Sequence, residues 1–344
     1  MKVLRFIIVI LILVRGGSII LAQEEDCAFK LREAQQLYDN GKIENVPELL
    51  QPCIQRGFTQ EERLQAFKLI ILCEIYDDDQ VNAHAEMLSF LKRYPEYELS
   101  PTDPVEFRFI FEQYRTRPIL DLGLFVGGNM SHGMIRQPFS PFNLNREKPR
   151  YINDGISFQA GTVINFYVSN RIQICLEPMY AQSKIQLAYE KSSIDGFGAE
   201  TPDHFENQGF LYFPLSGTYE FTAGKFRPYG RLGGMLGLMF NNSTSTTQGI
   251  FQGPDEDNLE NRNRLNYWIF AGTGTKYKLN KGYFYLDARY NIGLNLYLGS
   301  TENRFRQDNH NWVYMYQDSD FRVNSFMISF GYVRSFYNPK RIGN

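Results

Sequence analysis

The sequence predicts an α+β chain in two parts, a small helical-repeat domain followed by an eight-stranded antiparallel transmembrane β-barrel. Three observations predict this fold class. Apolar residues recur with a helical period up to residue 117 and alternate with polar residues from 118 onward. The alternating runs are longer than the five or six residues typical of globular strands. The connections between these runs are alternately short and long, which is typical of membrane barrels.

The chain begins with a predicted export signal over residues 1–23. Lys2 and Arg5 precede an apolar run at 6–14, and small residues come before Gln23. A membrane anchor is the alternative, but nine apolar residues are too few to span a bilayer. The net charge of −2 and the lack of a basic block argue against a nucleic-acid partner.

Residues 24–117 are predicted to form five helices. Gly41 ends the first helix, and Thr59 with Glu62 forms a capping box for the third. Asp103 is the expected cap of the fifth helix, with Pro104 in its first turn. Two helical hairpins with a repeat of about 33 residues make the region tetratricopeptide-like. Such hairpins bind protein segments, although a plain spacer remains the alternative.

Candidate partner-binding side chains in this domain are Tyr38, Tyr76 and Phe90, each of which could equally belong to the core. The chain has four cysteines, Cys27, Cys53, Cys73 and Cys175. An antiparallel hairpin of the first two helices brings Cys27 to Cys53, and an exported chain meets oxidising conditions, so we prefer this disulfide. Cys73 lies among apolar residues and is expected to be a buried thiol. Other pairings of the four cysteines remain open.

Residues 118–337 contain the barrel strands. The predicted runs are 118–129, 155–168, 171–187, 209–221, 226–241, 264–279, 282–298 and 322–337. Most are long enough to cross a bilayer, which takes about 9–11 residues. The long connections are 130–154, 188–208, 242–263 and 299–321. Short turns lie at the end that holds both barrel termini. We therefore expect that end, the helical domain and the tail 338–344 to be periplasmic.

The inward-facing parity of the strands carries titratable residues of both signs. The predicted interior ion network comprises Asp121, Glu177, Glu220, Arg227, Arg231, Lys276, Asp287 and Arg289. An eight-stranded barrel is just wide enough for side chains to fill it, so a packed ion-pair core is favoured over a polar channel or a catalytic cluster. Trp268 and Phe270 share the inward parity and would narrow any passage. Pro178 cannot donate to the ladder, and an irregularity is expected there.

Other site chemistry finds little support. His84, His132, His204 and His310 are scattered and lack metal-ligand spacing, so neither a metal nor a cofactor is expected. No nucleophile elbow or phosphate-binding loop is present in the sequence. The mixed-charge loop 253–264 is expected to be a solvated hairpin tip; the alternative is a site for cations between lipopolysaccharide molecules. An enzymatic role is not expected.

Several strand segments resemble one family. "LEPMY" (176–180), "YFPLSGTYEF" (212–221) and "FRPYGRLGGMLGLMF" (226–240) are similar to blocks of the PorT-like, porin-like outer-membrane β-barrel proteins of Bacteroidota. The resemblance covers roughly residues 118–337 and implies a barrel in the bacterial outer membrane. Some members of the family belong to the type IX secretion machinery. The helical domain is not part of the family's barrel pattern.

Together these observations predict a non-enzymatic barrel that anchors a periplasmic protein-interaction domain. The expected setting is an envelope complex for secretion, motility or assembly. The expected partners are outer-membrane lipid and lipopolysaccharide, the barrel-insertion machinery and an envelope protein on the periplasmic side. The alternatives are a narrow channel for small solutes and a surface adhesin that acts through the long loops.

Overall fold

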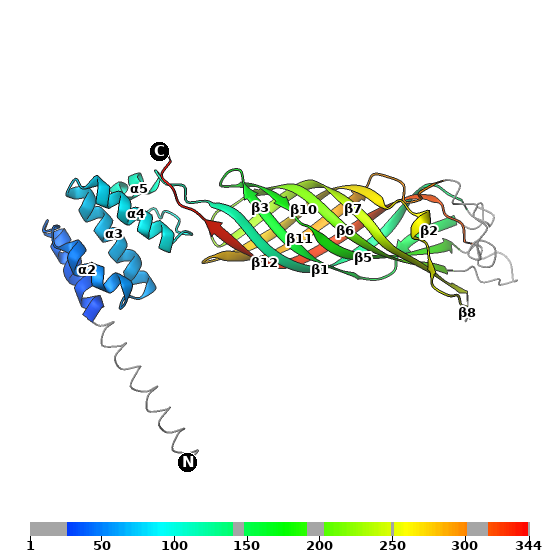
Figure 1. Ribbon diagram of the computed structural model, residues 1–344, viewed down its shortest axis with the longest axis horizontal. Helices are drawn as coiled ribbons and strands as arrows, with labels where there is room; N and C mark the ends of the chain where they lie inside the picture. The colour runs from blue at the N-terminus through cyan, green and yellow to red at the C-terminus, as the bar shows by residue number, and fades with distance from the viewer. Residues whose placement is uncertain (1–25, 140–147, 191–202, 249–250, 301–315, 343–344) are drawn as a thin grey trace, which may run out of the picture. The chain divides into compact units, whose positions relative to one another are not determined.

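The computed structural model describes residues 26–139, 148–190, 203–248, 251–300 and 316–342 (Figure 1). The chain divides into two compact units. One contains the residues up to Arg117 together with those from Tyr337 onward, and the other is Pro118–Phe336. The boundary between the units falls where the apolar period changes from helical to alternating.

The helical unit contains five helices in its described residues. They are a first helix over residues 26–39, then α2 (Val46–Gln55), α3 (Gln60–Tyr76), α4 (Gln80–Arg93) and α5 (Val105–Phe111). Gly41 follows the first helix with a φ of +75°, a conformation that glycine adopts without strain. The capping box at α3 is present: the Thr59 side chain accepts from Glu62 N–H, and the Glu62 carboxylate accepts from Thr59 N–H.

The start of α5 differs from the sequence prediction. Its N-cap residue is Pro104, and no side chain caps the helix. The Asp103 carboxylate instead accepts hydrogen bonds from the Ser100 N–H, the Tyr97 hydroxyl and the Lys68 ammonium. Lys68 lies on α3, so Asp103 ties the loop before α5 to α3 rather than capping the helix that follows it.

Two covalent or backbone links close the helical unit. A disulfide joins Cys27 on the first helix to Cys53 on α2, as the hairpin geometry predicts, and Cys73 is a buried free thiol. The C-terminal tail runs beside the segment that follows α5. Arg115 N–H donates to Lys340 O at 2.9 Å, and Ile342 N–H donates to Gln113 O at 2.7 Å. The tail is therefore part of the helical unit.

The second unit is a closed antiparallel sheet (Figure 1). Its strands are β1 (Pro118–Gln137), β2 (Lys148–Asn153), β3 (Ser157–Tyr167), β4 (Ile172–Leu176), β5 (Met179–Glu190), β6 (Asp203–Glu220), β7 (Phe226–Gln248), β8 (Phe251–Gln252), β9 (Glu256–Asp257), β10 (Leu265–Leu279), β11 (Gly282–Gly293) and β12 (Asp320–Tyr337). Hydrogen-bonded neighbours run from β1 through β3, β4, β6, β7, β10, β11 and β12 and back to β1. The sheet therefore has the closed form of a barrel.

The described part of the sheet has twelve strands where the sequence predicts eight runs. The predicted run 171–187 divides into β4 and β5 at Glu177–Pro178, because proline has no N–H to donate to the ladder. Three further strands, β2, β8 and β9, lie in segments predicted as loops. Gly155, with a φ of +90°, lies in the link between β2 and β3.

Side chains alternate between the two faces of the barrel wall. On β11, Phe284, Leu286 and Ile292 are exposed on the outer face, while Asp287 and Arg289 are buried inside. The other long strands repeat this pattern, so an apolar outer surface surrounds a polar and aromatic interior. Separately, no helix in the described ranges is both long enough and apolar enough to cross a membrane.

Candidate functional site

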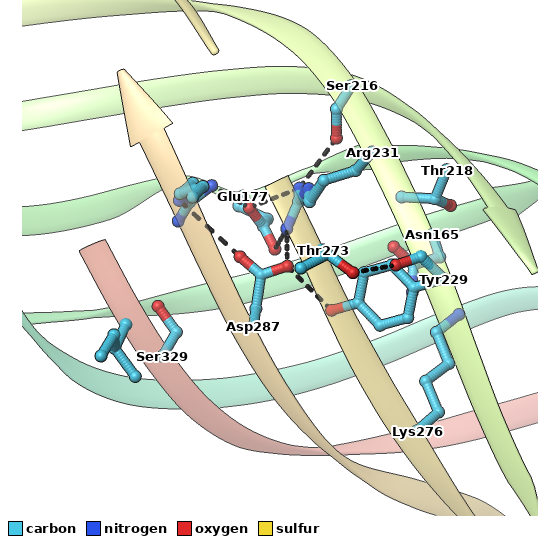
Figure 2. Close-up of polar contacts among 12 residues, drawn as sticks. Asn165, Glu177, Ser216, Thr218, Tyr229, Arg231, Thr273, Lys276, Asp287 and Ser329 are labelled. Carbon is cyan, nitrogen blue, oxygen red and sulfur yellow. Dashed lines mark hydrogen bonds and ion pairs between the residues drawn. The ribbon is translucent and has the colours of Figure 1, made fainter. Parts of the chain in front are cut away.

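The candidate site is the barrel interior. Its first feature is a cluster of Glu177, Arg231, Asp287 and Arg289, which we call the Glu177 network. Figure 2 shows Glu177, Arg231 and Asp287 of this network. Arg231 donates from Nη1 and Nη2 to the two Glu177 oxygens, at 3.1 and 2.8 Å. Arg289 Nη1 donates to Glu177 Oε2 at 2.6 Å. Arg231 Nη1 also donates to Asp287 Oδ2 at 3.2 Å. Two cations and two carboxylates thus balance each other in a site that is closed to solvent.

The strand break positions Glu177 for these contacts. The Glu177 N–H donates to Pro214 O on β6 at 3.1 Å, which holds the residue to the wall although it lies between β4 and β5. Arg231 comes from β7 and Arg289 from β11, so the network connects strands across the lumen. The ring of Phe270 lies 5.6 Å from the Arg231 guanidinium and 5.5 Å from that of Arg289. The aromatic face adds a favourable contact for both cations.

A second group surrounds Glu220 near the end of β6. Lys276 Nζ lies 2.8 Å from Glu220 Oε1, and Arg227 Nη1 lies 3.3 Å from Glu220 Oε2. Gln173 bridges Glu220 and Lys276, since its side chain donates to Glu220 at 2.7 Å and accepts from Lys276 at 2.7 Å. Asp121 stands apart from both groups. It accepts from the Tyr167 and Tyr283 hydroxyls at 2.7 and 3.0 Å.

The structure therefore places all eight predicted interior residues inside the barrel, but in separate groups. Four form the Glu177 network, Glu220 forms a second group with Arg227 and Lys276, and Asp121 is held by tyrosines. A cavity of about 20 Å³ lies between the groups, beside Lys276 and Glu177. That volume has room for about one water molecule.

Aromatic side chains fill the next level of the lumen. Phe210 and Tyr212 stack at 4.9 Å, and the Trp268 ring meets Tyr212 edge-on at 5.2 Å. Trp268 Nε1 on β10 donates to Val323 O on β12 at 2.8 Å, which links two strands on either side of β11. Trp268 and Phe270 are buried, as their parity predicts. This layer and the ion groups leave a tightly filled interior.

A further ion cluster was not found from the sequence. In this Arg262 network, the Arg262 guanidinium contacts the carboxylates of Glu206 and Asp318, at 2.6 and 2.8 Å. The Arg262 side chain is fully buried. Tyr316 Oη accepts from Arg262 Nη2 at 2.7 Å and donates to Asp318 at 2.7 Å. Three segments far apart in the sequence meet here.

The Arg262 network corrects the interpretation of loop 253–264 as a solvated hairpin tip. Asn258 and Arg262 are buried, and Asn258 Nδ2 donates to Thr244 Oγ1 on β7 at 3.1 Å. Glu256 and Asp257 form β9, which pairs with β7. The sequence could have placed Glu206 inside the barrel, because Glu206 shares its parity with the inward residues Phe210 and Tyr212 of the same strand.

The three candidate partner-binding residues of the helical unit differ in accessibility. Phe90 is fully buried and packs edge-on against Phe67 and Phe107, so it is a core residue, which is one of the two alternatives that the sequence left open. Tyr76 is 54% exposed, and its ring lies 6.0 Å from that of Tyr38. Burial and a hydrogen bond to Tyr76 raise the pKa of Tyr38 to about 12. Tyr76 is therefore the most accessible of the three.

Comparisons with known proteins found similar solved structures and one family model. Three solved structures that the barrel matches are the Neisserial surface protein A, OprG from Pseudomonas aeruginosa and the attachment invasion locus protein Ail of Yersinia pestis. Their sequences are 16%, 13% and 15% identical to this chain, with TM-scores of 0.29, 0.36 and 0.26. The matches cover 62%, 64% and 63% of this chain and 97%, 98% and 99% of those chains.

Among curated proteins, none matches the sequence significantly. The family model described as "Outer membrane protein beta-barrel domain" matches residues 111–298, which is more than half of the chain. The matched range contains β1 to β11 and all eight predicted interior residues. The chain therefore belongs to the outer membrane protein β-barrel domain family.

Proposed function

We propose that the protein is a non-enzymatic outer-membrane anchor for a periplasmic protein-interaction domain. In this proposal the ring of paired strands is an eight-stranded barrel that fixes the chain in the membrane with its short turns in the periplasm. The helical unit is a tetratricopeptide-like module that binds another envelope protein. The complex would serve secretion, motility or assembly, as the resemblance to PorT-like barrels of the type IX system suggests.

The observation that carries the proposal is the filled lumen. Charged side chains that pair across the barrel, with an aromatic layer beyond them, occupy the space that a solute would need. Opening such a path would separate buried ion pairs, which is costly. The filled lumen favours an anchor over the alternative of a narrow channel.

The helical unit supports the second half of the proposal. Its core is closed by a disulfide and by the paired C-terminal tail, so it has a defined surface to present. Apolar side chains remain exposed on that surface, including Val81 at 79% and Phe109 at 69%. Exposed apolar residues of this kind are suited to contact with a partner protein.

The test is photo-crosslinking in intact cells with the full-length chain. A photoreactive residue replaces Tyr76, Val81 or Phe109 in turn, and adducts are identified by mass spectrometry. We expect one envelope protein to be captured from these positions and not from a matched position at Asp255, an exposed residue of the barrel unit. Capture of the same protein from Asp255, or none from the helical unit, would contradict the proposal.

Planar-bilayer recording tests the filled lumen independently. We expect purified protein to give no reproducible single-channel currents. Sizeable and uniform currents would show that the barrel conducts, and the channel alternative would then replace the anchor.

A further inference from the structure

The barrel wall has a seam between β1 and β2. The ladder that joins β1 to β3 ends at the pair Asn129–Ser157. Beyond that pair, β1 continues to Gln137 alongside β2, but within the described strands β2 pairs with β5 and not with β1. The Ser131 N–H donates to the Asn153 side chain at 3.2 Å and spans the seam. The two facing strand edges therefore carry backbone donors and acceptors that are not paired in a shared ladder.

The seam opens into a groove of about 490 Å³. Its lining is His132, Gly133, Met134, Ile135, Pro149, Arg150, Tyr151, Ile152 and Asn153. Tyr151 is buried and stacks on Phe321 at 3.9 Å, so the interior is closed behind the groove. The groove is therefore a feature of the barrel's outer surface and not an entrance to the lumen.

The chemistry of the lining is amphipathic and cationic. Met134 and Ile152 are exposed apolar residues, and Arg150 is an exposed cation on the same strand as Ile152. None of the nine lining residues is acidic, and Asp154, the nearest carboxylate in sequence, is not part of the lining. A ligand that matches this lining has an apolar part and an anionic part.

The groove lies where the outer surface of the barrel changes character. Along β5 the outward side chains change from Tyr180 to Gln182, Lys184 and Gln186. The register places Gln186 opposite Ile152. The groove thus lies at the border of the apolar band on the long-loop side of the barrel, the level at which lipid headgroups meet it.

We propose that this groove binds a phosphate-bearing glycolipid of the outer leaflet. Arg150 holds the phosphate, because a guanidinium donates two parallel hydrogen bonds to phosphate oxygens. Lys184 carries a second positive charge on the neighbouring strand β5, where its backbone O accepts from Asp154 N–H at 3.5 Å beside the end of β2. The strand edges bond sugar hydroxyls, and Met134 with Ile152 contacts an acyl chain. The assignment to the outer leaflet rests on the orientation proposed above.

The experiment measures lipid binding to the purified full-length protein by native mass spectrometry. The probes are diphosphoryl lipid A, dephosphorylated lipid A and phosphatidylglycerol. We expect wild type to bind diphosphoryl lipid A in preference to the other two. Arg150→Gln should weaken that binding by about tenfold or more, since it removes a charge-assisted contact. Ile152→Trp, which fills the groove, should also weaken it. Lys225→Gln, a matched loss of one exposed cation at the short-turn end, should leave binding unchanged.

Three results would overturn the inference. If dephosphorylated lipid A binds as well as diphosphoryl lipid A, the phosphate is not what the protein recognises. If the Arg150→Gln protein binds diphosphoryl lipid A as well as wild type does, this groove is not the binding site. Equal, Arg150-dependent binding of phosphatidylglycerol would overturn the glycolipid as the ligand. None of these measurements involves the helical unit, so failure here is separate from failure of the proposed protein partnership. Labelling of a Lys225→Cys variant by a membrane-impermeant maleimide applied outside intact cells would overturn the outer-leaflet assignment.

Discussion

Two of the ion networks buried in the described part of the barrel, the Glu177 network and the Arg262 network, are built in different ways. In the Glu177 network, Arg231, Asp287 and Arg289 all come from regular strands, and Glu177 is held to β6 by its N–H. In the Arg262 network, only Glu206 comes from a long strand, while Arg262 and Asp318 lie in connecting segments. The hydrogen-bonded strands hold the side chains of the Glu177 network in place. In the Arg262 network, the ion pairs themselves hold two connecting segments against the barrel. Similar pairing chemistry should therefore have different consequences when it is broken.

The largest effect is expected for Glu177→Gln. This change leaves Arg231 and Arg289 facing one remaining carboxylate, Asp287, at a place where no segment can move out to solvent. We expect the free energy of unfolding of the barrel to fall by about 3–5 kcal/mol. Urea titration of the folded protein in detergent micelles measures it.

Glu260→Gln is the matched control for this prediction, because Glu260 is exposed and the substitution is identical. It should change the free energy of unfolding very little. If Glu177→Gln were equally mild, the network would not hold the barrel together, and the distinction between the two networks would lose its basis.

Arg262→Met should have the next largest effect, and a more local one. Glu206 and Asp318 lose their shared cation, but the connections that carry Arg262 and Asp318 can swing outward and hydrate the charges. We expect a loss of about 1–3 kcal/mol. Backbone hydrogen exchange should rise over residues 258–262 and 316–319 and stay low in β7 and β11. Exchange detected by mass spectrometry measures this.

Arg264→Met provides the control in the same segment, since Arg264 is exposed. It should leave exchange unchanged. A uniform rise in exchange through all strands of the Arg262→Met protein would mean that the two networks stabilise the barrel in the same global way.

The difference between the networks also explains how much the sequence could predict. Alternation along a strand assigns each side chain to one face, so parity alone places Glu177, Arg231 and Arg289 inside. Parity does not say which charges meet, and Asp121 is held by tyrosines rather than by a cation. Pairing depends on how strands are staggered around the ring, which the register of the whole sheet decides.

The sequence could not predict contacts made by connecting segments, because these have no period. Arg262 and Asp318 fall in this class. Phe90 on α4 shows the same limit in the helical unit, because it packs against Phe67 of α3 and Phe107 of α5. Helical spacing identifies an apolar residue but does not show which other helix covers it.

Asp121→Asn tests a buried carboxylate that has no ion pair, for comparison with the ion-paired Glu177. Asp121 makes no ion pair among the described residues, and its hydrogen-bond partners are the Tyr167, Tyr283 and Ser335 hydroxyls. Asparagine keeps a carbonyl oxygen that accepts such a bond. We expect the free energy of unfolding to change by about 1 kcal/mol or less, measured by the same urea titration. A loss as large as that of Glu177→Gln would show that burial of the carboxylate, and not its pairing with cations, is what matters.

The smallest effect is expected outside the barrel, at Asp103 in the helical unit. Burial alone would raise the pKa of this carboxyl, but hydrogen bonds from Lys68, Tyr97 and the Ser100 N–H outweigh it and hold the pKa below its usual value. The unfolded chain therefore binds a proton more readily than the folded one. The resulting stability is complete above about pH 4 and is lost as the pH falls through the lower folded pKa.

Circular dichroism at a helix-specific wavelength follows this unit in the full-length protein, because the other unit is a sheet. Asp103→Asn should lower helical stability at pH 7 and abolish its decline below pH 4. An unchanged acid profile in that variant would assign the decline to other carboxylates and leave the barrel networks as the ion pairs that matter to stability.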